Sequence, residues 1–331
     1  MSLLRWKTRA LCAAVLLAAA PAVAEKLTLA MPGVPPVFGS VVTYVAKEEG
    51  FFQKHGVEVE VRNFDSGAAA AQAVVAGTID ASLSPTPVIV RMTSNAGVDL
   101  VSFYGMQNPD WLLGSIDPAL SKCEDLKGQG VGVDSIGGAR AVALEQLIRP
   151  CGLKVDQVKL VPLSTNVGAA MVAGQIKFGV LHLDDVPVLE EQLTKKLTVI
   201  RSFKDVNQRS HYLVMVALRD KLKEKRDAYV RLTAALIDAT RFTLDKKNLD
   251  RVAQIAAVTG RTAKTAKDTL PLFARIELWP VGHDGLAKEN LDAVVATEKE
   301  LGGIKPGKTP IAYEKLVDRT VWNDAKKLAG K

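Results

Sequence analysis

An internal repeat constrains this fold more than any other feature of the sequence. The segment VVAGTIDASL at 74–83 has a counterpart, MVAGQIKFGV, at 171–180. The pattern around the first copy predicts strand, helix, strand, helix, strand, and the same order surrounds the second copy. Alternating strands and helices are typical of a parallel or mixed sheet with helices on both faces. The chain is therefore expected to form two similar α/β lobes.

The expected elements follow from apolar periodicity and from glycine at helix ends. The strands predicted for the first lobe are 27–31, 57–64 and 79–84, with helices at 40–52 and 66–77. Those predicted for the second lobe are 129–135, 158–164 and 178–183, with helices at 138–148 and 165–174. The later elements are a strand at 212–218 and helices at 221–245, 248–258, 262–270, 285–301 and 313–328.

Two predicted connections, 104–120 and 204–211, divide the chain. The first contains Pro109 and Pro118, which favour irregular backbone. After the second the chain is nearly all helical, and helices without strands of their own do not form a third lobe of the same kind. We therefore expect them to pack on the first lobe. The predicted lobes are 25–107 plus 212–331 and 108–211.

The first 24 residues are typical of a signal peptide. Arg5, Lys7 and Arg9 precede a short apolar run, and residues 22–24 fit a small-residue cleavage site. The run is too short to span a bilayer, so the mature chain, from Glu25, is expected to be periplasmic. Without the three basic residues the net charge falls from +7 to +4. This charge is spread along the chain, which argues against nucleic-acid binding.

Two cysteines, Cys123 and Cys151, remain in the mature chain. Exported compartments favour disulfides, and both residues are expected at the same end of one strand–helix unit. A structural disulfide and two separate buried thiols fit the sequence about equally well. The four histidines show no metal-binding spacing, and no G-x-S-x-G motif occurs. The sequence therefore predicts no metal, no cofactor and no enzymatic activity.

Four segments in a particular order and spacing carry a family resemblance. They are AKEEGFFQKHGVEVEVRNFDSG (46–67), AVVAGTIDASL (73–83), DLKGQGVGVDSIGG (125–138) and VAGQIKFGVL (172–181). The chain resembles the type II periplasmic solute-binding proteins of ABC importers, in the branch that binds nitrate, sulfonates, taurine and thiamine precursors. The resemblance implies two lobes, two crossovers, a ligand in the cleft between the lobes, and docking on a membrane permease. One departure is Lys177 and Phe178, where the family usually has Asp followed by small residues.

The candidate site lies at the strand exits, because ligands of open α/β sheets bind outside the carboxyl ends of the strands. After the first strand, a proline-rich loop that contains Pro35 is expected to form an apolar wall in which Phe38 or Val37 packs on the ligand, although prolines are also common turn residues. After the third strand, the hydroxyl groups of Ser84 and Thr86 are predicted either to bind the ligand or to cap the next helix.

Two predicted helix starts contain glycine and are expected to face each other across the cleft. Free backbone N–H groups at such starts bind anions, although Asp or Ser there also caps a helix without any ligand. Together the two starts are predicted to hold one small acid group. The residues expected to form this anion cradle are Asp65, Ser66, Gly67, Ser135, Gly137 and Gly138.

Five further residues have two interpretations each. Arg140, in a first helical turn, is expected either to be solvated or to face the ligand. Asp184 is predicted to bind an amine or a hydroxyl group or, with Asp185, to cap a helix. Asn108 and Trp111 lie in the first connection, where the indole is expected to stack on the ligand or to be buried between the lobes.

The sequence thus predicts an α/β protein of the type II periplasmic binding fold, each lobe a mixed sheet flanked by helices. As a monomer, it would capture a small organic anion for an ABC permease without altering it. The first alternative ligand is a neutral heteroaromatic, such as a thiamine-precursor pyrimidine, stacked on Trp111 or Phe38 and hydrogen-bonded by Asp184. The second alternative function is an exported hydrolase of unrecognised type.

Overall fold

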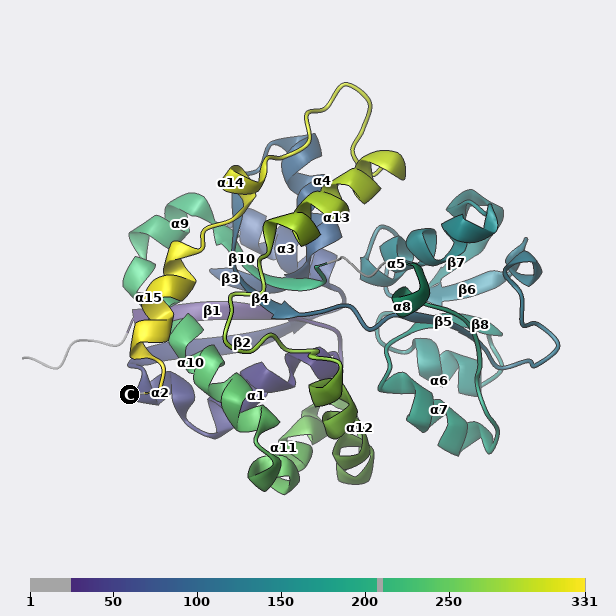
Figure 1. Cartoon of the computed structure of the whole chain (residues 1–331), viewed down its shortest axis with the longest axis horizontal. Coiled ribbons are helices and arrows are strands. Elements are labelled where there is room, and N and C mark those ends of the chain that lie inside the picture. The colour runs from purple at the N-terminus through teal and green to yellow at the C-terminus, as the bar shows by residue number, and fades with distance from the viewer. Residues whose placement is uncertain (1–24, 207–210, 331) are drawn as a thin grey trace, which may run out of the picture.

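The computed structural model describes residues 25–206 and 211–330, which form two lobes side by side (Figure 1). Each lobe is built on a five-stranded mixed sheet with helices against it. The predicted signal peptide, residues 1–24, lies outside the described residues. Among those residues, none of the helices combines the length and the apolar character that a membrane span requires.

The two sheets have the same strand arrangement. Their orders are β2-β1-β3-β10-β4 and β7-β6-β8-β5-β9. In each order the first three strands run parallel, and the fourth is antiparallel to both neighbours. The first sheet contains β1 (Glu25–Pro32), β2 (Val57–Phe64), β3 (Ala81–Pro85), β4 (Leu100–Gln107) and β10 (Leu213–Leu218). The second contains β5 (Leu112–Ser115), β6 (Gly130–Val133), β7 (Lys159–Pro162), β8 (Phe178–Leu181) and β9 (Thr198–Ser202).

Each antiparallel fourth strand enters its sheet directly after the chain crosses from the other lobe. β5 follows the crossover from Gln107 to Leu112, and β10 follows a second crossover that ends at Leu213. The prediction of a two-lobe α/β fold with two crossovers is therefore confirmed. We propose lobe boundaries within these crossovers, at 107/108 and 211/212.

The prediction of an irregular connection over 104–120 is wrong. Strand β4 extends to Gln107, and β5 occupies Leu112–Ser115. β4 pairs with β10, and β5 pairs with both β8 and β9, all of which come from distant parts of the sequence. Long-range pairing therefore decides the conformation here, and the two prolines lie outside both strands.

The helices of lobe 1 come from both ends of the chain. They are α1 (Val41–Glu48), α2 (Phe51–Lys54), α3 (Gly67–Val75), α4 (Thr86–Ala96), α9 (Arg219–Glu224), α10 (Arg226–Leu244), α11 (Leu249–Ile255), α12 (Ala263–Arg275), α13 (Lys288–Glu300), α14 (Tyr313–Leu316) and α15 (Thr320–Leu328). The helices of lobe 2 are α5 (Ala139–Ile148), α6 (Val167–Val172), α7 (Asp185–Leu193) and α8 (Phe203–Val206). The late helices pack on lobe 1, as Figure 1 shows.

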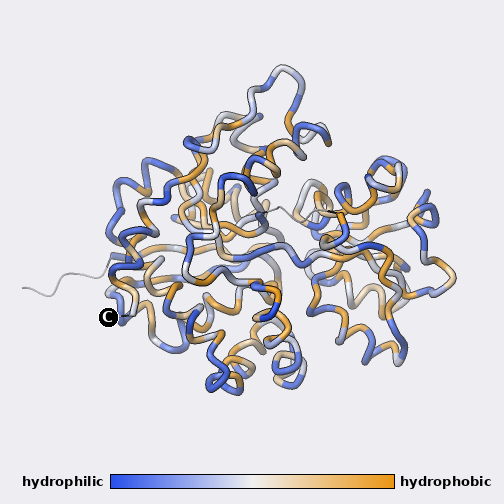
Figure 2. The backbone as a smooth tube through the Cα atoms, in the orientation of Figure 1, coloured by the Kyte–Doolittle hydropathy of each residue, from blue (hydrophilic) through white to orange (hydrophobic). Residues whose placement is uncertain are grey.

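Apolar residues concentrate in the strands and on the helix faces turned toward them (Figure 2). One buried cluster is continuous between the lobes and includes Phe103 of β4, Trp111 and Val131 of β6. The hydrophobic effect therefore stabilises each lobe and also the contact between them.

Lobe 2 contains two local features that the sequence raised. Cys123 and Cys151 are joined in a disulfide, with 6.1 Å between their Cα atoms. At the departure from the family pattern, the Lys177 ammonium pairs with the Asp117 carboxylate at 3.0 Å, and Phe178 is fully buried in β8. The ion pair fixes the turn before β8, so this departure leaves the fold unchanged.

Candidate functional site

A narrow gap lies between the lobes at the carboxyl ends of their parallel strands. Lobe 1 lines it with Pro32, Gly33, Val37, Asp65, Ser66, Gly67, Pro85 and Tyr212. The first crossover and lobe 2 line it with Trp111, Asp134, Ala139, Arg140, Thr165 and His182. Its volume is about 20 Å³, which is room for roughly one water molecule. An organic solute therefore enters only when the lobes separate.

Four of the residues expected at the site line this gap: Asp65, Ser66, Gly67 and Trp111. The first three lie at the start of α3, and Trp111 lies in the first crossover. Two segments that are distant in the sequence therefore both line the gap, as expected. The contact of each with a ligand stays a prediction.

The loop after β1 lines the gap, but Pro35 and Phe38 do not. Pro35 is exposed, and Phe38 is 2% exposed because its ring packs on Phe273 with the centroids 5.3 Å apart. Val37, which was expected as the alternative to Phe38, lines the gap together with Gly33. The loop was therefore predicted correctly, and the structure selects Val37 over Phe38.

Three polar residues predicted as ligand contacts are bonded to backbone carbonyl groups of lobe 1. Ser84 Oγ donates to the Gly67 carbonyl at 3.0 Å, and Thr86 Oγ1 donates to the Tyr212 carbonyl at 3.1 Å. The Asn108 side chain donates to the Glu277 carbonyl at 2.8 Å. Since these bonds use their donors on the protein's own backbone, the three residues position the loops around the gap.

The start of α3 is capped by the protein itself. Ser66 Oγ accepts the backbone N–H of Ala69 at 3.2 Å, which is the capping alternative considered from the sequence. Gly67 is required by close approach, because a Cβ at this position would lie 2.3 Å from Pro85 Cδ. Across the gap, Ser164 Oγ donates to the Asp65 carbonyl at 2.8 Å.

The start of α5 is filled by a carboxylate, so the predicted anion cradle there is wrong. Asp134 accepts the backbone N–H groups of Ala139 and Arg140 at 2.9 and 3.0 Å. Burial raises the pKa of the Asp134 carboxyl above its usual range despite these hydrogen bonds. The residues expected to form this part of the cradle, Ser135, Gly137 and Gly138, do not line the gap. An Asp before a glycine-containing helix start is a capping signal, and it was overlooked.

His182, just after β8, is the main site residue that the sequence did not reveal. Its ring stacks on Trp111 with centroids 3.7 Å apart, and Nδ1 lies 2.7 Å from Asp110 Oδ1. Its Nε2 is buried and has no hydrogen-bond partner among the described residues. Leaving such an atom unpaired costs roughly 1–3 kcal/mol, so a ligand that bonds to Nε2 would recover this energy.

Arg140 is not solvated, which was the simpler expectation. It is 3% exposed, lines the gap, and lies 5.5 Å from the centre of the Trp111 ring. Its Nη1 donates to the Val180 carbonyl at 2.5 Å and pairs with Asp185 at 3.3 Å. These contacts hold the guanidinium group beside the gap and partly neutralise it.

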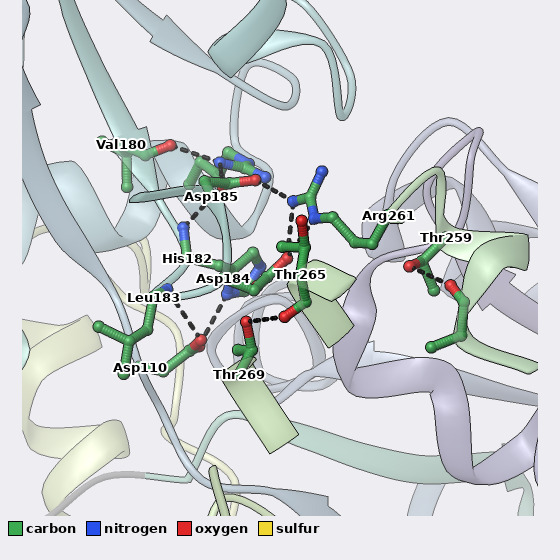
Figure 3. Close-up of polar contacts among 12 residues, drawn as sticks. Asp110, Val180, His182, Leu183, Asp184, Asp185, Thr259, Arg261, Thr265 and Thr269 are labelled. Atoms are coloured by element: carbon green, nitrogen blue, oxygen red, sulfur yellow. Dashed lines mark hydrogen bonds and ion pairs between the residues drawn. The ribbon is translucent and has the colours of Figure 1, made fainter. Parts of the chain in front are cut away.

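Arg261, before α12 of lobe 1, bridges to lobe 2 through two carboxylates (Figure 3). Its Nε and Nη2 lie 2.8 and 2.6 Å from Asp184 Oδ2, and Nη2 also contacts Asp185. Asp184 is therefore engaged in an interlobe ion pair, and it makes no side-chain cap to α7. Burial opposes ionisation of Asp185, but Arg261 and Arg140 outweigh it and lower its pKa to about 2.

The family model described as NMT1/THI5 like matches residues 38–248, and the chain belongs to this family. A candidate binding protein of Brucella abortus (strain 2308) is 20% identical over 296 residues, covering 88% of this chain and 91% of its own.

Two solved structures have similar folds. The alkanesulfonate-binding protein SsuA from Xanthomonas axonopodis pv. citri, bound to MOPS, has a TM-score of 0.71 at 17% identity, over 91% of this chain and 99% of its own. The periplasmic nitrate-binding protein NrtA from Synechocystis PCC 6803 has a TM-score of 0.74 at 12% identity, over 93% of this chain and 89% of its own. The fold is therefore that of the type II periplasmic binding proteins.

Proposed function

We propose that this chain is the solute-binding component of an ABC importer. It acts in the periplasm as a monomer, captures a small organic solute between its lobes and delivers it unchanged to a membrane permease. The family membership and the fold support this proposal. The observation that carries it is the gap between the two sheets, which is lined by the buried His182, whose Nε2 has no hydrogen-bond partner among the described residues.

Capture and release would occur by relative movement of the two lobes. The gap holds too little volume for an organic solute, so binding requires an open state and closure around the ligand. The ligand stabilises the closed state only through contacts that the open state lacks. Trp111 and Tyr212 lie at the two crossovers and line the gap, so these contacts form beside the segments that must bend.

The ligand class that we propose first is a small organic anion. Arg140 and His182 both line the gap. The Arg140 guanidinium carries N–H donors suited to a carboxylate or sulfonate, and His182 Nε2 donates to such a group when both ring nitrogens carry a proton, since Nδ1 faces Asp110. The sulfonate- and nitrate-binding proteins of similar fold are consistent with this choice.

A neutral heteroaromatic ligand is the second candidate, and a specific observation favours it. The Asp134 carboxylate lines the gap and would repel an anion, while it would accept hydrogen bonds from ring or amino N–H groups. Trp111, Tyr212 and His182 form a continuous set of aromatic rings beside it. Such rings suit a flat ligand.

A thermal-shift series on the mature chain tests the function and separates the two ligand classes. The compounds are methanesulfonate, nitrate, benzoate and a 4-aminopyrimidine, and a ligand at 100 times its Kd adds about 2.7 kcal/mol of stability. We expect His182→Ala to abolish the shift, while Phe38→Leu, which alters a residue outside the gap, preserves it. Recovery of a chemically altered ligand would contradict the proposal.

A further inference from the structure

A larger hollow lies in lobe 1, on elements that do not border the interlobe gap. It is formed by β4, α10, α15 and the loop 280–283, and its volume is about 350 Å³. Small-molecule pockets range from roughly 300 to 1,000 Å³. Figure 1 shows α10 and α15 on the side of lobe 1 away from lobe 2. No residue that lines this hollow also lines the gap.

The charge of this hollow has one sign. Four basic residues line it, and neither Asp nor Glu is among its lining residues. The positive charge comes from Arg241 of α10 and from the two lysines of α15, so a ligand in the hollow would be contacted by it from two helices. His283, in the loop, accepts the backbone N–H of Gly285 at Nδ1. The four residues are Arg241, His283, Lys326 and Lys327.

Neighbouring carboxylates neutralise this charge only in part. Asp238 lies 3.3 Å from Arg241, yet it also binds Lys54 at 3.1 Å and His55 at 3.0 Å. One carboxylate thus serves three basic groups. The Arg241 guanidinium therefore keeps much of its capacity to attract an anion.

The two lysines of α15 show the same excess of positive charge. Asp324 binds Lys327 at 2.8 Å and is shared with Arg226, also at 2.8 Å. Lys326 forms no ion pair within the described chain, and its ammonium lies 4.8 Å from the centre of the Trp322 ring. An exposed ammonium in this position is available to an incoming carboxylate or sulfonate.

The rest of the lining is mostly apolar. Trp322, Ile237, Pro280 and Val281 contribute to it. The buried Tyr104 adds a phenol whose pKa is raised to about 12 by burial, so this side chain stays neutral and carries no negative charge. The lining therefore combines a flat apolar surface with a surrounding set of cationic groups.

We propose that this hollow is a second binding site, for a small organic anion with a flat apolar body, such as an aromatic sulfonate. The apolar body would pack on Trp322, and the acid group would bind Arg241 and Lys326. The site uses none of the residues of the interlobe gap, so it is independent of which solute the gap takes.

Titration of the mature chain with naphthalene-1-sulfonate tests this proposal. The chain is labelled with 15N at tryptophan, so the indole N–H signals of Trp322 and Trp111 report the hollow and the gap separately. We expect a saturable shift of the Trp322 signal, weakened by added NaCl because the contact is ionic. We also expect neutral 1-naphthol to bind more weakly.

The double variant Arg241→Ala/Lys326→Ala should weaken the affinity at Trp322 by about tenfold or more, since it removes two charged hydrogen-bond donors. The matched control is Lys305→Ala/Lys308→Ala, which removes two exposed lysines outside the hollow and should leave the affinity unchanged. A shift confined to Trp111, equal binding of 1-naphthol, or wild-type affinity in the first variant would overturn the proposal. Its failure would leave the function proposed for the gap intact, because the Trp111 signal reports that site.

Discussion

The two lobes share one strand arrangement but present different chemistry to the gap between them. Lobe 1 contributes mainly proline, glycine and valine residues, with Asp65 as its charged lining residue. Lobe 2 contributes Asp134, Arg140 and His182. The comparison shows that both lobes share the repeated strands and helices, whereas the loops at equivalent strand ends differ. The loops of lobe 1 present mainly small and apolar residues to the gap, and those of lobe 2 present charged and polar residues.

The difference extends to the charged contacts that join the lobes. Arg261, which meets Asp184 of lobe 2, comes from the C-terminal helices and lies outside the repeat. On another face, Glu300 of α13 binds Arg149 of lobe 2 at 2.5 Å. Figure 1 places α12 and α13 on opposite sides of lobe 1. The C-terminal helices therefore supply two of the charged groups that join lobe 1 to lobe 2.

The largest effect is expected from Arg261→Ala, which removes the lobe 1 guanidinium that pairs with Asp184 and Asp185 of lobe 2. Asp184 and Asp185 would remain buried without this guanidinium, and breaking a buried ion pair costs roughly 3–5 kcal/mol. The lobes relieve that cost by separating, which returns the carboxylates to water. We expect a larger radius of gyration by small-angle X-ray scattering and weaker ligand binding.

The control for this prediction is Arg251→Ala, which breaks an ion pair with Glu49 inside lobe 1. It should leave the scattering profile unchanged. An Arg261→Ala variant as compact as the wild type would show that the ion pair does not hold the lobes together.

The second prediction concerns the disulfide, which lies in lobe 2. Replacing both Cys123 and Cys151 by Ser should destabilise lobe 2 by about 3 kcal/mol, since a cross-link of this loop length constrains the unfolded chain. Urea unfolding followed at Trp111 should shift more than unfolding followed at Trp279 of lobe 1. Equal shifts at the two indoles would mean that the lobes unfold as one unit.

The third prediction uses a carboxyl group of lobe 1 that is buried at the interlobe contact. Burial raises the pKa of Glu298 to about 7, against the attraction of Arg91, which also binds Glu145 of lobe 2 at 2.9 Å. Between the unfolded pKa and this value, the folded chain holds a proton that the unfolded chain releases. Stability therefore falls as the pH rises from about 4.5 to 7.

In Glu298→Gln, the decrease in the free energy of unfolding between pH 5 and pH 7 should be smaller by on the order of 2 kcal/mol, because the amide does not ionise. Thermal unfolding at a series of pH values measures it. Glu300→Gln, which alters an exposed carboxyl on the same helix, is the control and should retain the wild-type dependence. An unchanged slope in Glu298→Gln would show that this group titrates alike in both states.

The smallest effect is expected from removing one helix cap in each lobe. Asp134→Ala loses two accepted N–H groups and should cost about 2 kcal/mol, whereas Ser66→Ala loses one and should cost about 1 kcal/mol. Chemical denaturation of the two variants measures the difference. Equal costs would mean that burial of the Asp134 carboxylate cancels its second hydrogen bond.

Much of the fold was predictable because periodicity and glycine position are local signals. The parallel strands of both lobes, strand β10 and the division into two lobes follow from them, whereas β4, β5 and β9 were not expected. The errors arise where tertiary contacts decide. The helix expected at 40–52 is interrupted at Gly50, whose φ is 72°, and α12 continues past Pro271 because Phe273 beyond it is fully buried in the core.

The site was predictable at the level of loops but not of side chains. The strand exits that line the gap follow from the general position of ligands in α/β sheets. Which residue of each loop faces the gap depends on backbone direction over one or two residues. Phe38 packs into the core while the adjacent Val37 lines the gap, and His182 lines it while Asp184 binds Arg261.

The exchange of antiparallel strands between the lobes imposes an order on how the fold is completed during synthesis of the chain. Strand β10 pairs with both β3 and β4, and it follows the whole of lobe 2 in the sequence. Because the amino-terminal segment is synthesised first, β3 and β4 cannot pair with β10 until about a hundred more residues have been synthesised. Lobe 2, by contrast, is one continuous stretch of sequence. All of its strands are therefore synthesised before β10 completes the sheet of lobe 1.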